Sequence, residues 1–490
     1  MIKHIFKHCP VFAFKKTVLS GCLIFLAGCS TNPATGEQQF TALMSPHQEQ
    51  KVGAQEHQKI LEEYGLYQDQ GLQTFLQDVG QRVSRDTERP DVRYSFYLLD
   101  SSMVNAFALP GGYIYMTRGL LALANSEAEV ASVLAHETGH ITARHSAERY
   151  SRGVITMLGA AILSTAVGDD TVNDALGLGS DLYMKSYSRG QENEADMLGI
   201  RYLSRAGYDP RAMTSFLQSL QADTALESRI AGERADGLAA YMSTHPATQE
   251  RVTRTAAEVA KFPPAGKLER ESYLQRIAGM TYGESAGQGF VRGRTFYHTD
   301  LGFQFTVPEG FRLINRPLQV IGISDAGALI VFDFLPNPDG LHTKTYVQSV
   351  LLKDRPVPVE PIEINGMSGT TTSFKGSAKG RSLIIRLIVL PWGRDRMARF
   401  QIAYPPDYSA AGVRALQSST YSFKTMNAAD RKRIKPFRIS IVRAGPGDTV
   451  ANMAGRMPFD EFQQERFRVL NAMRADEQVI PGRLYKIVAE

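Results

Sequence analysis

The sequence predicts a multidomain protein with a mainly α-helical α+β domain first, then an α+β domain built on an antiparallel sheet, and last a small α/β domain. At 490 residues the chain is too long for one hydrophobic core. Helical periodicity dominates residues 46–262, whereas short alternating segments separated by turns dominate residues 296–427. The stretch FPPAG at 262–266 marks the boundary after the first region.

The N-terminal residues are typical of an export signal. Lysines precede the apolar run TVLSGCLIFLAGC, which is too short to span a bilayer and suits the core of a signal peptide. The ending LAGC resembles the lipobox of bacterial lipoproteins. That resemblance implies a signal peptide over 1–28, lipid on Cys29, and attachment to the outer membrane because Ser30 follows. A polar tether is then expected over 29–45. The alternative is an ordinary secretory signal.

Charge and cysteine content exclude two classes of protein. Four of the 55 basic residues precede residue 29, which leaves 51 basic against 50 acidic residues in the rest of the chain. This near-balance gives no electrostatic footprint for nucleic acid. Cys9 and Cys22 also precede residue 29. The exported chain would therefore contain no disulfide, and its core, with a metal as a further stabiliser, must hold it together.

The first domain begins with two expected helices. SPHQEQKVGAQEHQKIL at 45–61 opens with a Ser-Pro start signal, and GLQTFLQDVGQRVS at 71–84 has apolar residues at a helical period. Two strands are expected next, VRYSFYLLD at 92–100 and GGYIYMT at 111–117, because aromatic and β-branched residues are frequent in them.

Further helices are expected after these strands. Residues 126–152 predict one long helix that Ser126 caps, with Glu129 three positions on. The apolar stretch GVITMLGAAILSTAVG at 153–168 allows three interpretations, which are a buried helix, a mobile cover over an active site, or a segment in contact with the membrane. ENEADMLGIRYLSRAG predicts a helix that ends at Gly207.

The second region has another character. Residues 263–295 predict a linker with a short helix, YLQRIAGMTYG, and a loop. The expected strands of 296–427 are GFQFTVPEGF, LQVIGIS, ALIVFDFLP, GTTTSF, SLIIRLIVLP and MARFQIAYP. These segments predict an antiparallel sheet with few helices. The region contains no catalytic constellation, and we assign it no ligand.

The segment HETGH at 136–140 is the main chemical signal. On a helix His136 and His140 lie one turn apart on one face, where two imidazoles can share a zinc ion. Glu137 lies beside them and can act as general base on a water, as in H-E-x-x-H metallopeptidases. The competing interpretation is a set of polar residues on a partly exposed helix.

A third ligand is expected from a later helix. Glu192 of ENEAD is the candidate, and Asp196, one turn on, can accept a hydrogen bond from a ligand histidine. Glu194 points elsewhere on that helix and is the weaker candidate. His145 lies about 140° round the helix from His140, so we interpret it as structural. Two histidines and one glutamate leave a coordination position open, which indicates a catalytic zinc site.

The segments NAFALPGGYIYMTRGLL, EVASVLAHETGHITARHSAER, YSRGQENEADMLGIRYLSRAGYDP and STHPATQERV resemble the membrane-associated gluzincin peptidases. That family includes the CAAX prenyl endopeptidases, HtpX and periplasmic lipoprotein-type proteases such as BepA. The resemblance covers residues 45–260 and implies a zincin-type α+β peptidase domain at 46–262. It implies a site that combines zinc ligands, a catalytic base and a later histidine and arginine: His136, His140, Glu192, Glu137, His245 and Arg251.

His245 has two roles open to it by this resemblance. It could stabilise the oxyanion of the tetrahedral intermediate, or it could move onto the metal and close the site. A third, purely structural role is the alternative. Asn105 of NAFALPGGYIYMT could bond the backbone of an extended substrate, and Gly111 and Gly112 would allow close approach. The alternative for this stretch is a plain hairpin of the core sheet.

The function expected from these features is a zinc-dependent metalloendopeptidase with one Zn²⁺ per chain. By resemblance its substrates are misfolded polypeptides of the cell envelope, and it is a periplasmic protein anchored by lipid to the outer membrane. Glu137 takes a proton from a water and passes it to the leaving amine. The alternative functions are a chaperone or assembly factor with little proteolysis, and a cell-wall tether.

Residues 437–490 resemble a LysM module. The matching features are a first strand, GDTV opening a helix, LN after a second helix, and PGRLYKIV as the closing strand. LysM modules bind glycans such as peptidoglycan, so the resemblance allows a glycan-binding role. The alternative is a LysM-like domain that packs against protein.

Overall fold

The structure is a computed structural model, and it describes residues 29–167, 186–231, 245, 248–263, 265–378 and 380–490. For residues 157–167 it describes the backbone alone. The signal peptide expected over 1–28 lies outside the described residues. The chain divides into two compact units, and these are Met1–Met280 with Ile439–Ile487, and Thr281–Arg438 with Val488–Glu490.

The first unit is mainly helical. Its helices are α2 (Pro46–Tyr64), α3 (Gln70–Ser84), α4 (Arg118–Leu123), α5 (Glu127–Thr142), α6 (His145–Val167), α8 (Arg189–Arg205), α9 (Arg211–Ala231), α11 (Gln249–Val259), α12 (Arg270–Arg276), α16 (Val450–Ala454) and α17 (Gln463–Leu470). Its strands are β1 (Cys29–Thr31), β2 (Gln38–Phe40), β3 (Ser95–Leu99), β4 (Ala106–Leu109) and β5 (Tyr113–Thr117), with most of β18 (Phe437–Arg443) and β19 (Leu484–Ala489).

The predicted helix starts are confirmed. Ser45 caps α2 in a capping box with Gln48, and Pro46 occupies the first turn. The Ser126 side chain accepts a hydrogen bond from the backbone nitrogen of Glu129 at the start of α5. These caps fix the entry of both helices, and through α5 they fix the position of the HETGH segment.

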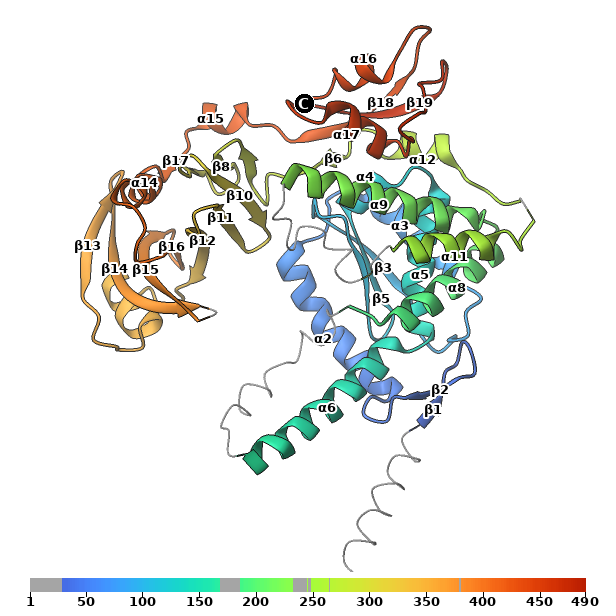
Figure 1. The fold of residues 1–490 in the computed structure, drawn as a ribbon, viewed down its shortest axis with the longest axis horizontal. Helices are drawn as coiled ribbons and strands as arrows, with labels where there is room; N and C mark the ends of the chain where they lie inside the picture. Colours follow the sequence, from blue (N-terminus) through green and yellow to red (C-terminus); the bar gives the residue numbers. More distant parts are fainter. Residues whose placement is uncertain (1–28, 168–185, 232–244, 246–247, 264, 379) are drawn as a thin grey trace, which may run out of the picture. The chain divides into compact units, whose positions relative to one another are not determined.

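A small sheet and two closely packed helices form the centre of the first unit. The strand order is β3-β5-β4, with β3 parallel and β4 antiparallel to β5. Helix α5 packs on β4 and β5, and α8 packs on α5 (Figure 1). Two glycines allow this closeness. A Cβ added at Gly139 would lie 3.1 Å from the Ala195 carbonyl oxygen, and one at Gly199 would lie 3.2 Å from the His136 nitrogen.

The prediction of one long helix over 126–152 was wrong. Helix α5 ends at Thr142, and α6 begins at His145. Between them Arg144 has a left-handed backbone with φ of 56°. Its side chain is held in place, because Nε lies 3.1 Å from Glu49 Oε1 and Nη2 donates to the Met44 carbonyl at 2.7 Å. These contacts stabilise a turn that the helical pattern alone does not reveal.

The polar tether expected over 29–45 is also corrected. Strands β1 and β2 pair as an antiparallel hairpin. The Asn32 side chain closes the turn by accepting from the backbone nitrogen of Ala34 at 2.9 Å. Asn32 also donates to Glu194 of α8 at 2.6 Å, and Arg201 of α8 donates to the Ala34 carbonyl at 3.4 Å. These contacts hold the polar segment on α8.

The glycines of the β4–β5 turn pack closely against other backbone segments of the first unit. Gly111 and Gly112 have φ of 84° and 102°, which favours glycine. A Cβ at Gly111 would lie 2.9 Å from the Gln50 Cα, and one at Gly112 would lie 2.4 Å from the Arg93 carbonyl oxygen. The close approach that we expected toward a substrate is thus made to α2 and to the segment before β3.

The second unit is built on antiparallel sheets, as predicted. One has the order β10-β11-β12-β16-β15-β14-β13, and another has the order β17-β9-β8-β7. The strands are β6 (Thr281–Tyr282), β7 (Phe290–Arg292), β8 (Thr295–His298), β9 (Phe303–Thr306), β10 (Phe311–Arg316), β11 (Gln319–Ser324), β12 (Leu329–Pro336), β13 (Val359–Ile364), β14 (Met367–Ala378), β15 (Arg381–Trp392), β16 (Arg396–Tyr404) and β17 (Lys424–Thr425). The helical elements are α13 (Thr343–Thr345), η3 (Tyr346–Leu351), α14 (Ala410–Tyr421) and α15 (Ala428–Arg433). Phenylalanines such as Phe303, Phe332 and Phe400 fill the core.

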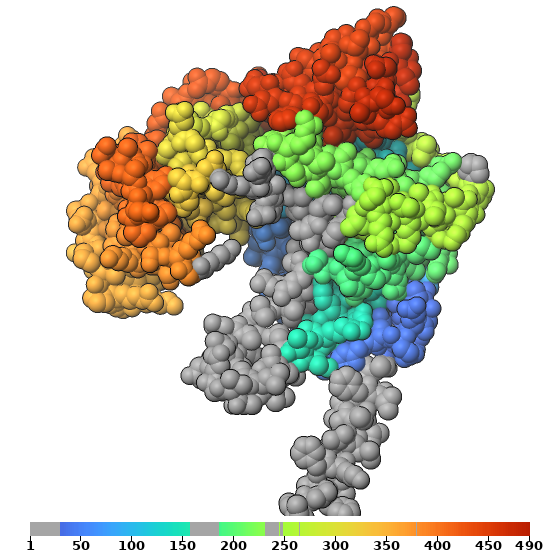
Figure 2. All heavy atoms as spheres, in the orientation of Figure 1, coloured from blue at the N-terminus to red at the C-terminus, as the bar shows by residue number. Residues whose placement is uncertain are grey.

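The C-terminal elements follow the expected order of strand, helix, helix and strand. They differ from the expectation of a separate domain, because residues 439–487 belong to the same compact unit as the helices of residues 46–262. Figure 2 shows these residues, in red, directly against α9, in green. Arg229 of α9 lies 3.1 Å from Glu465 of α17 and also faces the Phe462 ring. The expected boundary at 263 is likewise shifted, since the first unit continues to Met280.

Among the described residues no helix has the length and apolar character needed to cross a membrane. Three interpretations of residues 153–168 were expected: a buried helix, a cover over an active site, and a segment in contact with the membrane. Residues up to Val167 are helical in α6, whereas the side chains that would decide between burial, a cover and membrane contact lie outside the described residues.

Candidate metal centre

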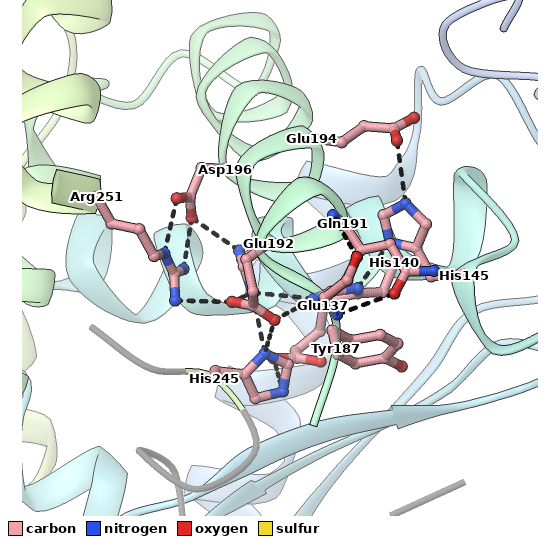
Figure 3. A network of polar contacts seen from close by, with 12 residues as sticks. Glu137, His140, His145, Tyr187, Gln191, Glu192, Glu194, Asp196, His245 and Arg251 are labelled. Atoms are coloured by element: carbon pink, nitrogen blue, oxygen red, sulfur yellow. Dashed lines mark hydrogen bonds and ion pairs between the residues drawn. The ribbon is translucent and has the colours of Figure 1, made fainter. Parts of the chain in front are cut away.

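His136 and His140 face each other on α5. Their Nε2 atoms lie 3.1 Å apart, and both side chains are buried. Burial lowers the pKa of His140 well below its usual range, although Glu192 opposes that effect. His140 is therefore neutral near pH 7, and the neutral imidazole is the form that binds a metal. The two histidines of HETGH thus lie on one side of α5, as expected, and Figure 3 shows His140 beside Glu137 and Glu192.

Glu192 comes from the first turn of α8, directly after the cap at Ser188. Its Oε1 lies 3.5 Å from His140 Nε2, and its Oε2 lies 3.6 Å from His136 Nε2. Burial alone would raise the pKa of Glu192, but His245 and His140 together hold it well below the usual range. The carboxylate is thus ionised and faces both imidazoles.

His245 completes this group. Its Nδ1 lies 2.8 Å from Glu192 Oε1 and 3.3 Å from His136 Nε2. His136, His140, Glu192 and His245 each offer a ligand atom, and these four atoms all lie within 4.8 Å of one another. All four residues are buried. Their imidazole nitrogens and carboxylate oxygens are ligand atoms that a zinc ion prefers.

Glu137 gives an independent test of whether an ion or water fits here. The side chain is 0% exposed, and neither carboxylate oxygen accepts a hydrogen bond from the described part of the chain. Burial raises the pKa of Glu137, with His245 and His136 opposing the rise. A buried carboxylate without a donor is costly, so the residues present fit a centre that holds a metal and a water.

Asp196 lies one turn after Glu192, as expected. Its Oδ1 is 3.1 Å from His136 Nδ1, on the side of the ring that faces away from His140. Arg251 donates to both oxygens of Asp196, at 2.9 and 2.7 Å, and its Nη1 lies 2.7 Å from Glu192 Oε2. Arg251 and His136 keep the pKa of Asp196 low although burial would raise it. Arg251 therefore connects the two carboxylates.

Asn105 directly precedes β4 and is buried. Its backbone is held in place by Thr117. The Asn105 nitrogen donates to Thr117 Oγ1 at 3.0 Å, and the Asn105 carbonyl accepts from the same hydroxyl at 2.9 Å. Its side-chain oxygen is buried and accepts no hydrogen bond from any described residue. The group of ligand atoms does not include Asn105, and its expected role toward a substrate stays a prediction.

Sequence reasoning missed Tyr187. Its ring stacks on His140 with centroids 3.7 Å apart and an interplanar angle of 18° (Figure 3). Its hydroxyl lies 3.1 Å from Ser146 Oγ, and Arg149 lies 4.2 Å from the ring centroid. The available signal was the position of this aromatic residue immediately before the Ser188 cap, where apolar side chains commonly fold back on a helix.

The comparisons with known proteins point to one peptidase family. Residues 71–259 match peptidase family M48. This segment is therefore similar to the M48 peptidases. The match contains the HETGH and ENEAD segments and His245.

Three curated relatives are similar to the part of the chain that contains this match. The beta-barrel assembly-enhancing protease of Yersinia pestis is 31% identical and covers 49% of this chain and 50% of the relative. A putative protein of the same name from Vibrio cholerae is 32% identical, covering 51% and 53%. The mitochondrial metalloendopeptidase OMA1 of Schizosaccharomyces pombe is 27% identical, covering 46% and 64%. The match thus spans about half the length of the two bacterial relatives.

Proposed function

We propose that this chain is a zinc-dependent metalloendopeptidase in which His136, His140 and Glu192 hold one zinc ion. The observation that carries the proposal is the buried group of ligand atoms, all within 4.8 Å of one another, beside the Glu137 carboxylate. Two imidazoles and one carboxylate are the ligand set of catalytic zinc sites, which keep one position for water or substrate.

The side chains around this centre each have a task in peptide hydrolysis. A bound zinc ion supplies Lewis acidity toward the scissile carbonyl and the attacking water. Glu137 takes a proton from the water and delivers it to the leaving amine, and its raised pKa brings the carboxylate closer to the operating pH. Asp196 orients His136 by its contact with Nδ1. Glycines 139 and 199 let α8 bring Glu192 to the two histidines.

His245 is proposed to close the centre in the resting state. Its Nδ1 lies among the ligand atoms, 3.3 Å from His136 Nε2, which supports a role as a further ligand that blocks the open position. In this position its Nε2 lies 3.7 Å from Glu137 Oε1. The other role, stabilising an oxyanion, would require the imidazole to leave the ligand group.

The substrates and the location are proposed from the relatives and the N-terminal residues. The bacterial relatives are named as proteases that enhance β-barrel assembly, which supports misfolded or misassembled envelope polypeptides as substrates. We propose that lipid on Cys29 anchors the chain to the outer membrane and that the M48 domain works in the periplasm. For residues 437–490 we favour a packing role over peptidoglycan binding, because Lys486 is buried against α4.

The test compares the full chain with its Glu137→Gln variant for zinc content and casein cleavage. We expect one zinc per chain in both proteins and a loss of cleavage of about 10²–10⁴-fold in the variant. Glu127→Gln, on the same helix but bonded to Tyr208, is the matched control and should cleave normally. A wild-type chain without zinc would overturn the proposal. Full rescue of a deletion strain by Glu137→Gln would favour the chaperone alternative, and binding of the full chain to isolated peptidoglycan would restore the glycan role.

A further inference from the structure

A chain of polar contacts leads away from His140 to the N-terminal hairpin. His140 Nδ1 lies 2.8 Å from His145 Nδ1, and His145 Nε2 lies 3.2 Å from Glu194 Oε2. The other oxygen of Glu194 accepts from Asn32 Nδ2 at 2.6 Å. Four side chains from α5, α6, α8 and the β1–β2 turn are thereby joined. The first of them is a proposed zinc ligand.

The proton positions along this series of contacts follow from the metal-facing nitrogen of His140 at one end and the Glu194 carboxylate toward the other. The Nε2 atom of His140 faces His136 and Glu192, so a metal would occupy that side and the proton would sit on Nδ1. His140 Nδ1–H then donates to His145 Nδ1. That nitrogen must be unprotonated, so a neutral His145 carries its proton on Nε2 and donates it to the acceptor-only Glu194 carboxylate. Every donor meets an acceptor, ending at the Asn32 amide.

The contact between His140 and His145 depends on a break between α5 and α6. The left-handed turn at Arg144 rotates His145 toward His140, whereas a continuous helix would put it about 140° away. His145 is 1% exposed. Both ring nitrogens of His145 have a partner, and one of these partners is the Nδ1 atom of His140.

The arrangement parallels the one at the other ligand. His136 presents Nδ1 to Asp196 at 3.1 Å, and Arg251 holds Asp196 in turn. His140 presents Nδ1 to His145, and Glu194 holds His145 in turn. Contacts of this kind fix the tautomer and the ring plane of a ligand histidine.

We infer that His145 is a positioning residue for His140, and that Glu194 and Asn32 extend this support to the hairpin of residues 29–40. The inference rests on the proposed function, because it takes His140 as a metal ligand. It assigns a task to three residues that the ligand set does not contain. It also makes the N-terminal hairpin a contributor to metal affinity rather than a passive connection.

The test measures zinc affinity by competition with a chelator, using the full chain purified in detergent. We expect His145→Ala to weaken zinc binding by about 10–100-fold. His145→Asn should recover part of this loss, because its side-chain oxygen can accept from His140 Nδ1. Glu194→Ala and Asn32→Ala should have progressively smaller effects. Cobalt-loaded His145→Ala should show shifted visible absorption bands, since the orientation of one ligand changes.

Thr142→Val is the matched control. Thr142 is buried near the same end of α5, but its hydroxyl bonds to Tyr202 instead of the chain of contacts described above. We expect unchanged zinc affinity for Thr142→Val. Urea unfolding of the metal-free proteins separates loss of fold from loss of affinity. If His145→Ala does not fold, Glu194→Ala decides, because it leaves His145 in place.

Three results would overturn the inference while leaving the proposed function intact. The first is wild-type zinc affinity and cobalt spectrum in His145→Ala. The second is an equal loss of affinity in Thr142→Val, which would make the effect general. The third, needed only if His145→Ala is unfolded, is unchanged affinity in Glu194→Ala. A wild-type chain that binds no zinc would instead remove the proposed function itself.

Discussion

The side-chain nitrogen of Lys486 donates a hydrogen bond of 2.7 Å to the carbonyl of Ala124, which lies 362 positions earlier in the chain. It also donates to Ala122 at 2.7 Å and Leu123 at 3.1 Å, and the side chain is 0% exposed. Burial lowers the pKa of Lys486, and the Glu129 carboxylate opposes that. Three carbonyl acceptors require three N–H donors, which only the ammonium form has. It caps α4, where cations are favoured.

Replacing this lysine tests how firmly the C-terminal elements belong to the first unit. Lys486→Met keeps the length of the side chain but leaves three carbonyls without their donor and removes one of the positive charges near Glu129. We expect a loss of about 3–5 kcal/mol in the free energy of unfolding. Urea denaturation followed by circular dichroism measures it. Lys424→Met, at an exposed position of β17, is the control and should change little; equal midpoints for the two variants would contradict the capping role.

The packing of α8 on α5 predicts the effect of a single methyl group. In Gly199→Ala the new Cβ would lie 3.2 Å from the His136 nitrogen and 3.3 Å from its Cα. Backbone atoms cannot move aside, so α8 must shift, at a cost of about 1–3 kcal/mol. Zinc affinity should fall because Glu192 moves with α8.

A glycine on the same helix provides the comparison for that variant. At Gly190 an added Cβ meets only the Ser188 hydroxyl, at 3.9 Å. Gly190→Ala should therefore be neutral or stabilising, since alanine favours helix. Isothermal titration with zinc, together with thermal unfolding, measures both variants. Normal zinc affinity in Gly199→Ala would show that the contact between the helices does not set the position of Glu192.

Arg251 is expected to be irreplaceable by lysine. Its guanidinium contacts both oxygens of Asp196 and one of Glu192, and a lysine ammonium cannot reproduce this planar geometry. Arg251→Lys should destabilise the metal-free protein by about 2–4 kcal/mol, because a buried carboxylate loses a partner.

The neighbouring Arg254 is the matched control, because it makes a single contact of 3.2 Å with Asp196 and is 27% exposed. Arg254→Lys should cost less than about 1 kcal/mol. Chemical denaturation of the metal-free variants gives both values. A similar loss in the two variants would mean that Arg251 acts only as a positive charge.

The second unit should lose stability in mild acid through His298. Burial lowers the pKa of His298 to about 4, with Asp300 opposing the shift, and its Nδ1 accepts from the Leu301 nitrogen. The unfolded chain has the ordinary value of about 6.5 and so binds more protons between the two values. Stability should therefore decrease as pH falls from about 6.5 toward 4, by at most about 3 kcal/mol.

Fluorescence of the single tryptophan, Trp392, reports on this unit because it packs against the same core. Urea unfolding at several pH values in this range should show the decrease. His298→Asn retains an acceptor but does not titrate, so its pH dependence should be flatter than that of the wild type. His342→Asn, at an exposed cap in the same unit, should keep the wild-type slope. A wild-type slope in His298→Asn would exclude this histidine as the cause.

The chemistry of the centre was readable from the sequence because local spacing determines it. His136 and His140 are one helical turn apart in any α-helix, and the same is true of Glu192 and Asp196. Their meeting across α5 and α8 followed from the resemblance to a known family. The strands of the second unit were predicted for a similar reason, since their alternation and turns are local signals.

The supports of the centre could not be predicted, because they depend on partners far away in sequence. Arg144 adopts a left-handed turn only where Glu49 and the Met44 carbonyl hold it. Asn32 reads as part of a polar connection until Glu194 is placed next to it. Lys486 resembles any lysine of a closing strand, and only the fold reveals that it is buried.

The cap on α4 has a consequence for the order of events during biosynthesis. Helix α4 directly follows β5 and precedes α5, yet the group that satisfies its last carbonyls comes from residue 486. A nascent or translocating chain that has presented only its first three hundred residues lacks this group. The cap on α4 therefore forms only after residue 486 has emerged, so the first unit completes its fold late in the synthesis of the chain.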